Sequence, residues 1–299
     1  MRARLWRIGG WTVGIGLAAA LGMLAVSRVA VGMIVAAPSP AGGAMTAPED
    51  VAAVLEVERD GAVLRAWVFE PEGEPRGTVL CLHGIRDSKV AHVPTARRLA
   101  GLGLRAVVVD SRGHGESTGE WLSYGVHESE DLRAVADALD RRAELTEPLL
   151  VVGSSYGAAT AIQYGALDPR VRGVVAIAPF ASLREVVRAY QGWMLGPLAA
   201  IIPESRTDAM IDAAGEQARF DPDDACARCA AEQLRVPLLL VHGRADERIP
   251  WQHSAAIRDA AAGPVELRVI DGVGHLGIGR APGVSEAVDA FLLARTAGP

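Results

Sequence analysis

Cysteine is scarce in this sequence of 299 residues, which has only Cys81, Cys226 and Cys229. Cys81 stands in an apolar run and is expected to be a small buried side chain. Cys226 and Cys229 form a single C-x-x-C with no second pair and no nearby histidine, which is weak evidence for zinc. We interpret the pair as structural or as a local disulfide, ahead of a metal ligand, and expect no metal site.

Basic runs are also absent after the first few residues. The formal net charge is −6, and the acidic residues are spread along the chain. A nucleic-acid partner requires a clustered basic surface, so this class of partner is not expected. Distributed acidity is typical of a solvated surface. Half of the residues are apolar, and the chain beyond its N-terminal segment has the length of one α/β domain.

An uncharged and almost wholly apolar stretch covers residues 8–27. About 20 helical residues at ~1.5 Å each span the ~30 Å hydrocarbon core of a bilayer. Arg2, Arg4 and Arg7 precede the stretch, and only Arg28 follows it closely. This asymmetry predicts a cytoplasmic N-terminus and an extracytoplasmic domain.

We expect residues 1–37 to form the cytoplasmic N-terminus and a single transmembrane helix, with Arg28 at the far interface. Residues 38–50, rich in Ala, Gly and Pro, are expected to be a linker. The alternative is a cleaved signal peptide, which would leave a secreted protein. Signal peptides usually have an apolar core of about 7–15 residues, and no clear cleavage site precedes Pro38, so the uncleaved anchor is favoured.

Residues 51–299 alternate short apolar runs with helical spacing. Asp60-Gly61 is a turn signal between two strand-like runs, which predicts an N-terminal antiparallel hairpin. The later runs are continuous and apolar, as in parallel strands buried on both faces. The expected fold is α/β, a mostly parallel sheet with helices on both faces. Expected strands cover residues 51–59, 62–70, 78–82, 105–109, 149–152, 171–177, 238–241 and 266–270, and expected helices cover residues 93–102, 128–142, 156–167, 254–262 and 285–293.

The alternation is interrupted at about residues 181–236. This stretch contains large apolar side chains such as Tyr190, Trp193 and Met194 without the punctuation of strands. It is too long for an ordinary connection. We predict a helical cap inserted over the strand ends, where open α/β sheets place their sites.

The motif with the clearest chemistry is Gly153-Ser154-Ser155-Tyr156-Gly157, which matches G-x-S-x-G. An apolar run precedes it and a helix is expected after it, as in a nucleophile on a strained strand-to-helix turn. The start of that helix offers free N–H groups and a positive dipole to developing negative charge. Ser155, at the central position, is the predicted nucleophile.

A serine hydroxyl needs a base, and in this architecture the acid and then the histidine follow the serine along the chain. His275 follows the last expected strand, at the same sheet edge as Ser155, and is the predicted base. His242 ends the penultimate strand before any suitable acid, and His253 is expected in a surface loop. Asp246 follows the penultimate strand and is the predicted acid that orients the imidazole.

Three other acidic residues are assigned lesser roles. Glu247 is the alternative acid, because it shares the loop of the preferred aspartate. Asp271 ends a strand and is expected to form a turn. The segment 110–117 lacks the Lys-Ser/Thr of a phosphate loop, so it is interpreted as a structural turn with an Asp110–Arg112 contact.

An oxyanion hole requires two backbone donors. The N–H of Tyr156, directly after the nucleophile, is one predicted donor. The N–H of Ile85, in the loop after the run at 78–82, is the other, and Arg86 is its alternative. His83 is expected to shape this loop.

Together these features resemble the α/β-hydrolase superfamily over roughly residues 51–293. The segment 110–117 and residues 178–182 are similar to the branch of serine aminopeptidase-like and dienelactone-hydrolase-like proteins, which also includes membrane-anchored thioesterases and lipases. The resemblance implies the sheet topology, the cap, and hydrolysis of an ester, thioester or amide through an acyl-enzyme without a metal or organic cofactor. It rests on His83-Gly84, the turn at 110–117, Gly153–Gly157, Gly243–Asp246 and Gly274-His275, in family order.

The expected activity is of the carboxylesterase type, on a small-molecule or acyl substrate. An aminopeptidase-like peptidase ranks below it, because no carboxylates dedicated to a peptide's free amine are recognisable in the sequence. A non-catalytic, membrane-tethered binding domain of the same fold is the alternative from another class. The presence of serine, acid and histidine together argues against that alternative.

Overall fold

The computed structural model describes residues 29, 31–39 and 41–296. Most of the predicted anchor, including the uncharged stretch 8–27, therefore lies outside the described residues. Within the described ranges, no helix has the length and hydropathy needed to cross a bilayer.

Eight strands form one sheet in the order β1-β2-β4-β3-β5-β6-β7-β8. β2 runs antiparallel to β1 and β4, and every other neighbouring pair is parallel. The predicted mostly parallel sheet with an N-terminal hairpin is thus confirmed. The strands are β1 (Ala53–Arg59), β2 (Ala62–Phe69), β3 (Thr78–Leu82), β4 (Arg105–Asp110), β5 (Leu149–Ser154), β6 (Val171–Ile177), β7 (Leu238–Gly243) and β8 (Val265–Ile270).

The position of a strand in the sheet explains its sequence pattern. β3, in the middle, is buried at every residue, whereas β1, at one edge, alternates buried and exposed positions. Asp60 and Gly61, between β1 and β2, both have positive φ, as a two-residue hairpin turn requires. Continuous apolar runs therefore mark strands that are covered on both faces.

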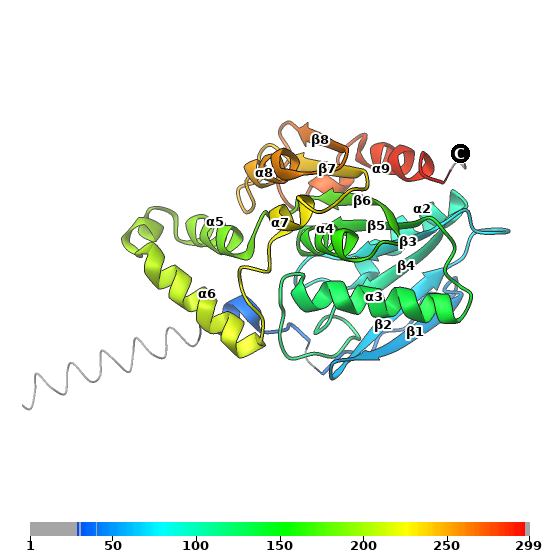
Figure 1. Ribbon diagram of the computed structural model, residues 1–299, viewed down its shortest axis with the longest axis horizontal. Coiled ribbons are helices and arrows are strands. Elements are labelled where there is room, and N and C mark those ends of the chain that lie inside the picture. The colour runs from blue at the N-terminus through cyan, green and yellow to red at the C-terminus, as the bar shows by residue number, and fades with distance from the viewer. Residues whose placement is uncertain (1–28, 30, 40, 297–299) are drawn as a thin grey trace, which may run out of the picture.

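Helices cover both faces of this sheet (Figure 1). Buried side chains of α3, α4, α7 and α8 join one hydrophobic core, and those of α2 and α9 join the other. These elements are α2 (Val93–Gly101), α3 (Val126–Arg141), α4 (Tyr156–Leu167), α7 (Ala227–Ala231), α8 (Gln252–Ala260) and α9 (Val284–Leu293), with short 3-10 helices η1 (Lys89–His92) and η3 (Ile278–Arg280).

The stretch predicted as a cap forms an arm that projects from the side of the sheet (Figure 1). The arm consists of α5 (Leu183–Leu195), η2 (Gly196–Ile201) and α6 (Glu204–Ala218), and α7 leads back to the domain. Ser182 caps α5 by accepting a hydrogen bond from the N–H of Glu185. Arg184 of α5 pairs with Asp212 of α6 at 2.8 Å, which holds the two helices together.

Described residues of the segments 31–39 and 41–45 lie against the domain that contains the sheet. Val35 is fully buried, its carbonyl accepts the N–H of Leu122 at 2.8 Å, and Tyr124 donates its hydroxyl to the carbonyl of Ile34. Further on, the N–H of Gly43 donates to the carbonyl of Gly115. The last residues assigned to the anchor and the first of the expected linker are therefore part of the folded domain. Their backbone groups form hydrogen bonds with backbone and side-chain groups of residues 115–124.

A buried lysine that the sequence analysis did not single out connects this segment to the sheet. Lys89 is fully buried, and its Nζ lies 2.5 Å from Asp110 and 2.6 Å from Glu116. The ammonium also lies over the Trp67 ring, 4.4 Å from its centroid. Glu116 in turn accepts the N–H of Met45. The expected Asp110–Arg112 contact is wrong, because Lys89 binds Asp110.

Lys89→Met should destabilise the protein strongly. Methionine keeps most of the stem volume but leaves the Asp110 carboxylate buried without its cation, a loss of about 3–5 kcal/mol. The free energy of unfolding from urea denaturation measures it. Val90→Ala, on the neighbouring exposed side chain, is the control and should change stability by less than about 0.5 kcal/mol. Equal stability of the two variants would show that the ion cluster adds nothing.

Candidate active site

Ser155 occupies a sharp turn between β5 and α4. Its φ of 52° and ψ of −111° are unfavourable for a residue with a side chain. The flanking glycines make this turn possible. A Cβ on Gly153 would come 2.1 Å from the carbonyl oxygen of Gly157, and one on Gly157 would come 2.6 Å from that of Leu82. The motif G-x-S-x-G is thus required by backbone crowding, and it presents the hydroxyl at the end of the strand.

A chain of hydrogen bonds joins the three residues predicted as nucleophile, base and acid. The Nε2 atom of His275 lies 3.0 Å from the Oγ of Ser155, and its Nδ1 lies 2.6 Å from the Oδ2 of Asp246. A carboxylate only accepts, so Nδ1 carries the proton and Nε2 accepts from the serine hydroxyl. In this tautomer the imidazole is ready to take the hydroxyl proton.

Two neighbouring loops bring the acid and the histidine together. Asp246 follows β7 and His275 follows β8, and the loops are joined where the N–H of Ala245 donates to the carbonyl of Val273 at 3.0 Å. Because β5, β7 and β8 run in one direction, their carboxyl ends meet at the same edge of the sheet.

The Asp246 carboxylate is buried and held at both oxygens. Its Oδ1 accepts the backbone N–H groups of Arg248 and Ile249, at 3.0 and 2.9 Å. Burial opposes ionisation, but hydrogen bonds from His242 and His275 outweigh it and hold the pKa of Asp246 well below its ordinary value. The carboxylate is therefore charged at neutral pH and can stabilise an imidazolium.

The other acidic residues of this region lie apart from His275. The alternative acid, Glu247, is exposed to solvent. Asp271 is exposed as well and pairs with Arg244. Of the three, Asp246 is the one whose carboxylate contacts the histidine.

His242, which the sequence analysis set aside as a base, contacts the acid from the other side. Its Nε2 lies 2.8 Å from the carbonyl of Ile249 and 3.2 Å from the Oδ2 of Asp246, and its Nδ1 lies 2.7 Å from the Oγ of Ser254. Because Nε2 faces two acceptors, it carries the proton, and Nδ1 accepts from the hydroxyl. No local pattern in the sequence identified it, because the contact depends on how the loop after β7 folds back.

The loop after β3 lies beside Ser155. The N–H of Gly157 donates to the carbonyl of His83 at 3.1 Å, and a Cβ on Gly84 would lie 3.7 Å from that of Ser155. Ile85 follows in this loop, and Tyr156 begins α4. The two predicted oxyanion donors thus come from segments that flank the hydroxyl.

His83 holds this loop in place. Its ring is fully buried, with Nε2 accepting the N–H of Ser111 at 3.1 Å and Nδ1 lying 2.8 Å from the carbonyl of Gly84. Burial and the neighbouring His114 lower the pKa of His83 well below its ordinary value, so the ring is neutral. Arg112 pairs with Asp131 at 2.6 Å and not with Asp110.

The cap arm reaches the acid loop through α5. Trp193 lies under the guanidinium of Arg248, 4.7 Å from its ring centroid, and packs edge-on against Tyr190. Arg248 donates its N–H to Asp246, so one residue connects the cap to the acid. The arm thereby contacts the loop that follows β7.

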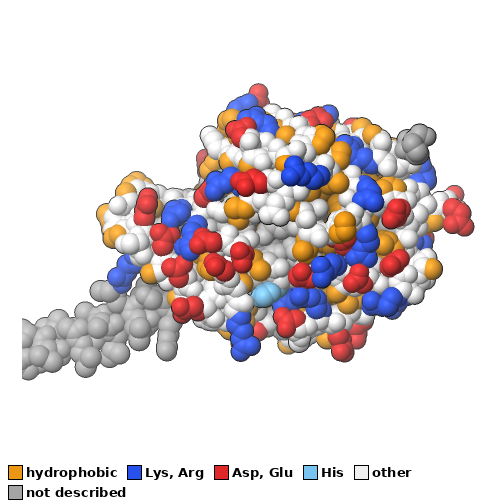
Figure 2. Space-filling model, viewed as in Figure 1, with side chains coloured by type: hydrophobic (Ala, Val, Ile, Leu, Met, Phe, Trp, Pro, Cys, Tyr) orange, Lys and Arg blue, Asp and Glu red, His pale blue; other side chains and the backbone are white. Residues whose placement is uncertain are grey.

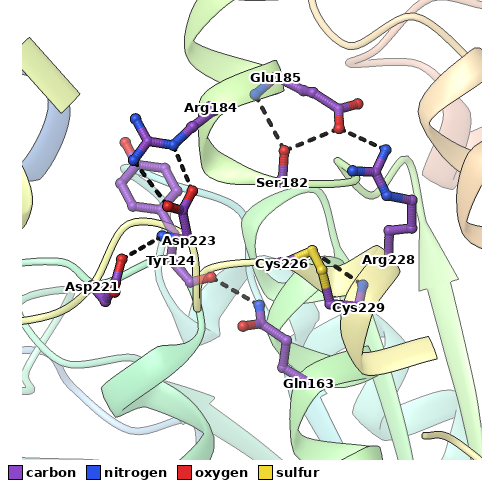
Figure 3. The surroundings of a disulfide bond; sticks show 10 residues. All are labelled: Tyr124, Gln163, Ser182, Arg184, Glu185, Asp221, Asp223, Cys226, Arg228 and Cys229. Atoms are coloured by element: carbon purple, nitrogen blue, oxygen red, sulfur yellow. Dashed lines mark hydrogen bonds and ion pairs between the residues drawn. A yellow bond between two sulfur atoms is a disulfide. The ribbon is translucent and has the colours of Figure 1, made fainter. Parts of the chain in front are cut away.

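Cys226 and Cys229 form a disulfide at the start of α7 (Figure 3). Beside it, Arg228 pairs with Glu185 of α5 at 2.8 Å, so this turn ties the return of the cap to its first helix. Cys81 is buried in β3, and burial raises the pKa of its thiol to about 12. In the part of the chain that the structure describes, no cluster of three or more His, Cys, Asp or Glu side chains is arranged to hold a metal ion.

Two curated proteins resemble the chain over most of its length. The monoacylglycerol lipase of Mycolicibacterium smegmatis is 29% identical over 245 residues, which cover 70% of this chain and 84% of that protein. The uncharacterized protein YqkD of Bacillus subtilis is 24% identical over 225 residues, 72% of this chain and 70% of that protein.

Solved esterases share the fold. The Pyrococcus furiosus esterase Pf2001 superposes with a TM-score of 0.69 at 22% identity, covering 87% of this chain and 98% of that chain. Est1E of Butyrivibrio proteoclasticus, solved with ferulic acid bound, superposes with a TM-score of 0.63 at 20% identity, covering 82% of this chain and 100% of that chain. At these identities the likeness shows the fold alone.

A family model matches residues 73–228, which is more than half of the chain. It is the model Hydrolase_4, described as serine aminopeptidase, S33. The matched range includes Ser155 and ends before Asp246 and His275. The protein therefore belongs to the Hydrolase_4 (serine aminopeptidase, S33) family and has the α/β-hydrolase fold.

Proposed function

We propose that the protein is a serine hydrolase that cleaves an ester, thioester or amide bond through an acyl-enzyme, with activity of the carboxylesterase type. The observation that carries this proposal is the chain of hydrogen bonds from Ser155 through His275 to Asp246, at 3.0 and 2.6 Å. Such a chain lets a serine hydroxyl attack at neutral pH, because the proton has an acceptor and the resulting imidazolium has a partner.

The proposed reaction has two halves. Ser155 Oγ attacks the carbonyl carbon while its proton passes to His275 Nε2, and Asp246 stabilises the imidazolium. The oxyanion accepts hydrogen bonds from the N–H groups of Tyr156 and Ile85. His275 then protonates the leaving group, and the carbonyl re-forms as an ester on Ser155. In the second half a water molecule, deprotonated by His275, hydrolyses that ester, so the cycle requires no cofactor.

Ester cleavage is preferred over peptide cleavage. The lipase relative and the esterase structures favour an ester substrate, whereas the family description refers to an aminopeptidase. A free peptide amine needs carboxylates near the nucleophile, whereas Asp246 is already engaged by two histidines and Asp271 by Arg244. A series of p-nitrophenyl esters, with aminoacyl p-nitroanilides in parallel, separates the two activities.

Ser155→Ala should abolish turnover while leaving the fold intact. Loss of the nucleophile costs several orders of magnitude in rate, whereas removal of one hydroxyl adds no volume. Hydrolysis of p-nitrophenyl butyrate and labelling by a fluorophosphonate probe measure the effect, and Ser154→Ala is the matched control that should keep both.

If Ser155→Ala retains more than about a hundredth of the activity, equivalent to ~3 kcal/mol or less of transition-state stabilisation, the nucleophile is misassigned. Absence of labelling in the parent protein would favour a non-catalytic binding domain.

Asp246→Asn should lower kcat/KM by about 10²–10⁴-fold, because an amide at this position favours the wrong imidazole tautomer. Glu247→Gln and Asp271→Asn, both on exposed side chains, are the controls and should have little effect. His242→Gln should fall between these limits, since it removes one partner of the carboxylate and leaves His275 in place. Thermal unfolding of each variant separates lost chemistry from lost structure. If Asp246→Asn is folded and has near-wild-type activity while Glu247→Gln is inactive, Glu247 is the acid instead of Asp246.

We further propose that residues 8–27 anchor the protein in a membrane with the hydrolase domain on the extracytoplasmic side. The uncharged stretch after Arg2, Arg4 and Arg7 supports this orientation. The disulfide between Cys226 and Cys229 is consistent with it, because disulfides persist in oxidising compartments. A secreted form after signal cleavage is the alternative.

Protease treatment of intact spheroplasts tests this topology. We expect the protein in the membrane fraction and its domain to be digested without lysis. A domain that survives until the cells are lysed would exclude the proposed orientation. Recovery of a soluble, N-terminally shortened protein outside the cells would favour the signal peptide instead.

A further inference from the structure

The cap arm ends in a cluster of exposed apolar side chains. Five of them, which we call the cap tip, lie within nine consecutive residues at the end of α5 and in η2. They are Trp193, Met194, Leu195, Leu198 and Ile201, of which Leu198 and Ile201 are 63% and 76% exposed. No residue of η2 is buried. Hydrophobic side chains are visible along the outer end of the arm in Figure 2.

Two basic side chains of α5 pair with acidic side chains of α6 and of the segment after it. Arg184 pairs with Asp212 and Asp223, and Arg188 pairs with Asp208. These ion pairs involve residues 184, 188, 208, 212 and 223, whereas the stretch from 189 to 203 contains no charged residue. A partner that binds the tip therefore has to offer apolar surface rather than complementary charge.

The N-terminal segment enters the domain beside this arm. Val31 lines a shared cavity with Met210 of α6 and with Pro203, which lies between η2 and α6. Val29 and Met33 are exposed there as well, at 64% and 55%. The 28 residues that precede Val29 include the uncharged stretch 8–27. The first described residues after this stretch of sequence thus lie at the cap-arm end of the domain.

We infer that the cap tip is a lipid-contact surface that inserts into the interface of the bilayer in which residues 8–27 are anchored. A bilayer fits better than a second copy of the chain, because the arm projects from the domain (Figure 1) and Val31, which follows the proposed anchor in the sequence, lies beside α6. Trp193 is suited to the boundary between headgroups and acyl chains. Its ring contacts Arg248, so the membrane face would continue to the acid loop. The inference rests on the proposed anchor and is independent of hydrolytic activity.

Single-site fluorescence labelling of the full chain tests this inference. Leu198→Cys and Ile201→Cys carry an NBD label, and Val54→Cys, 52% exposed on the edge strand β1, is the matched control. Native thiols do not interfere, because Cys81 is buried and the other two form the disulfide. The labelled proteins are reconstituted into phosphatidylcholine vesicles and isolated by flotation. Thermal unfolding confirms that each variant is folded.

Labels at the tip should be quenched several-fold less by iodide than the label at Val54, and they should be quenched by doxyl groups on the lipid chains. Tip labels that iodide quenches as well as Val54, in vesicles that float, would overturn the lipid contact and leave the anchor intact. Failure of the protein to float overturns both. Labels shielded from both quenchers would show that protein covers the tip, and disulfide-linked dimers of Ile201→Cys in detergent would identify a second copy as that protein.

Discussion

The parallel alignment of β3, β5, β7 and β8 is the constraint on which the candidate site depends. Parallel strands place their carboxyl ends at one edge of the sheet, so loops that are far apart in sequence become neighbours. Ser155 and His275 are 120 residues apart and are joined by a hydrogen bond there. Backbone hydrogen bonds also link neighbouring loops directly. The N–H of Ala245, for example, donates to the carbonyl of Val273 and so holds the loop of the acid beside the loop of the histidine.

Buried charges reinforce the loops around this edge, and each has a partner. Lys89 joins the loop after β3 to Asp110 at the end of β4, Arg112 joins the next turn to α3, and Asp246 is shared by two histidines. An isolated buried charge is costly, so such pairs are sensitive to the loss of either member. These pairs fix the positions of the loops relative to one another, whereas burial of apolar side chains stabilises the core.

The end of the molecule that contains the cap, Val29 and residues 31–37 exposes a group of large apolar side chains. The sheet is enclosed by helices, whereas the arm carries exposed apolar residues at its tip and a network of ion pairs on its flank. Trp193 and Arg248 connect this arm to the acid loop. The surface proposed to meet the lipid and the groups proposed to perform hydrolysis are therefore neighbours in the fold, although they belong to different segments of the chain.

The strands, the turn at Ser155 and the loops that contain Asp246 and His275 could be predicted from the sequence, because they depend on local patterns of apolar runs, glycines and turn residues. The partners of buried polar groups could not be predicted in this way and are known from the folded chain alone. Lys89 binds Asp110, Arg112 binds Asp131, and His242 contacts Asp246, since these pairs are chosen by distances across the folded chain. The packing of Val35 against the domain could not be predicted from the sequence either. An apolar residue after a membrane-like stretch has the same local pattern whether it contacts lipid or protein.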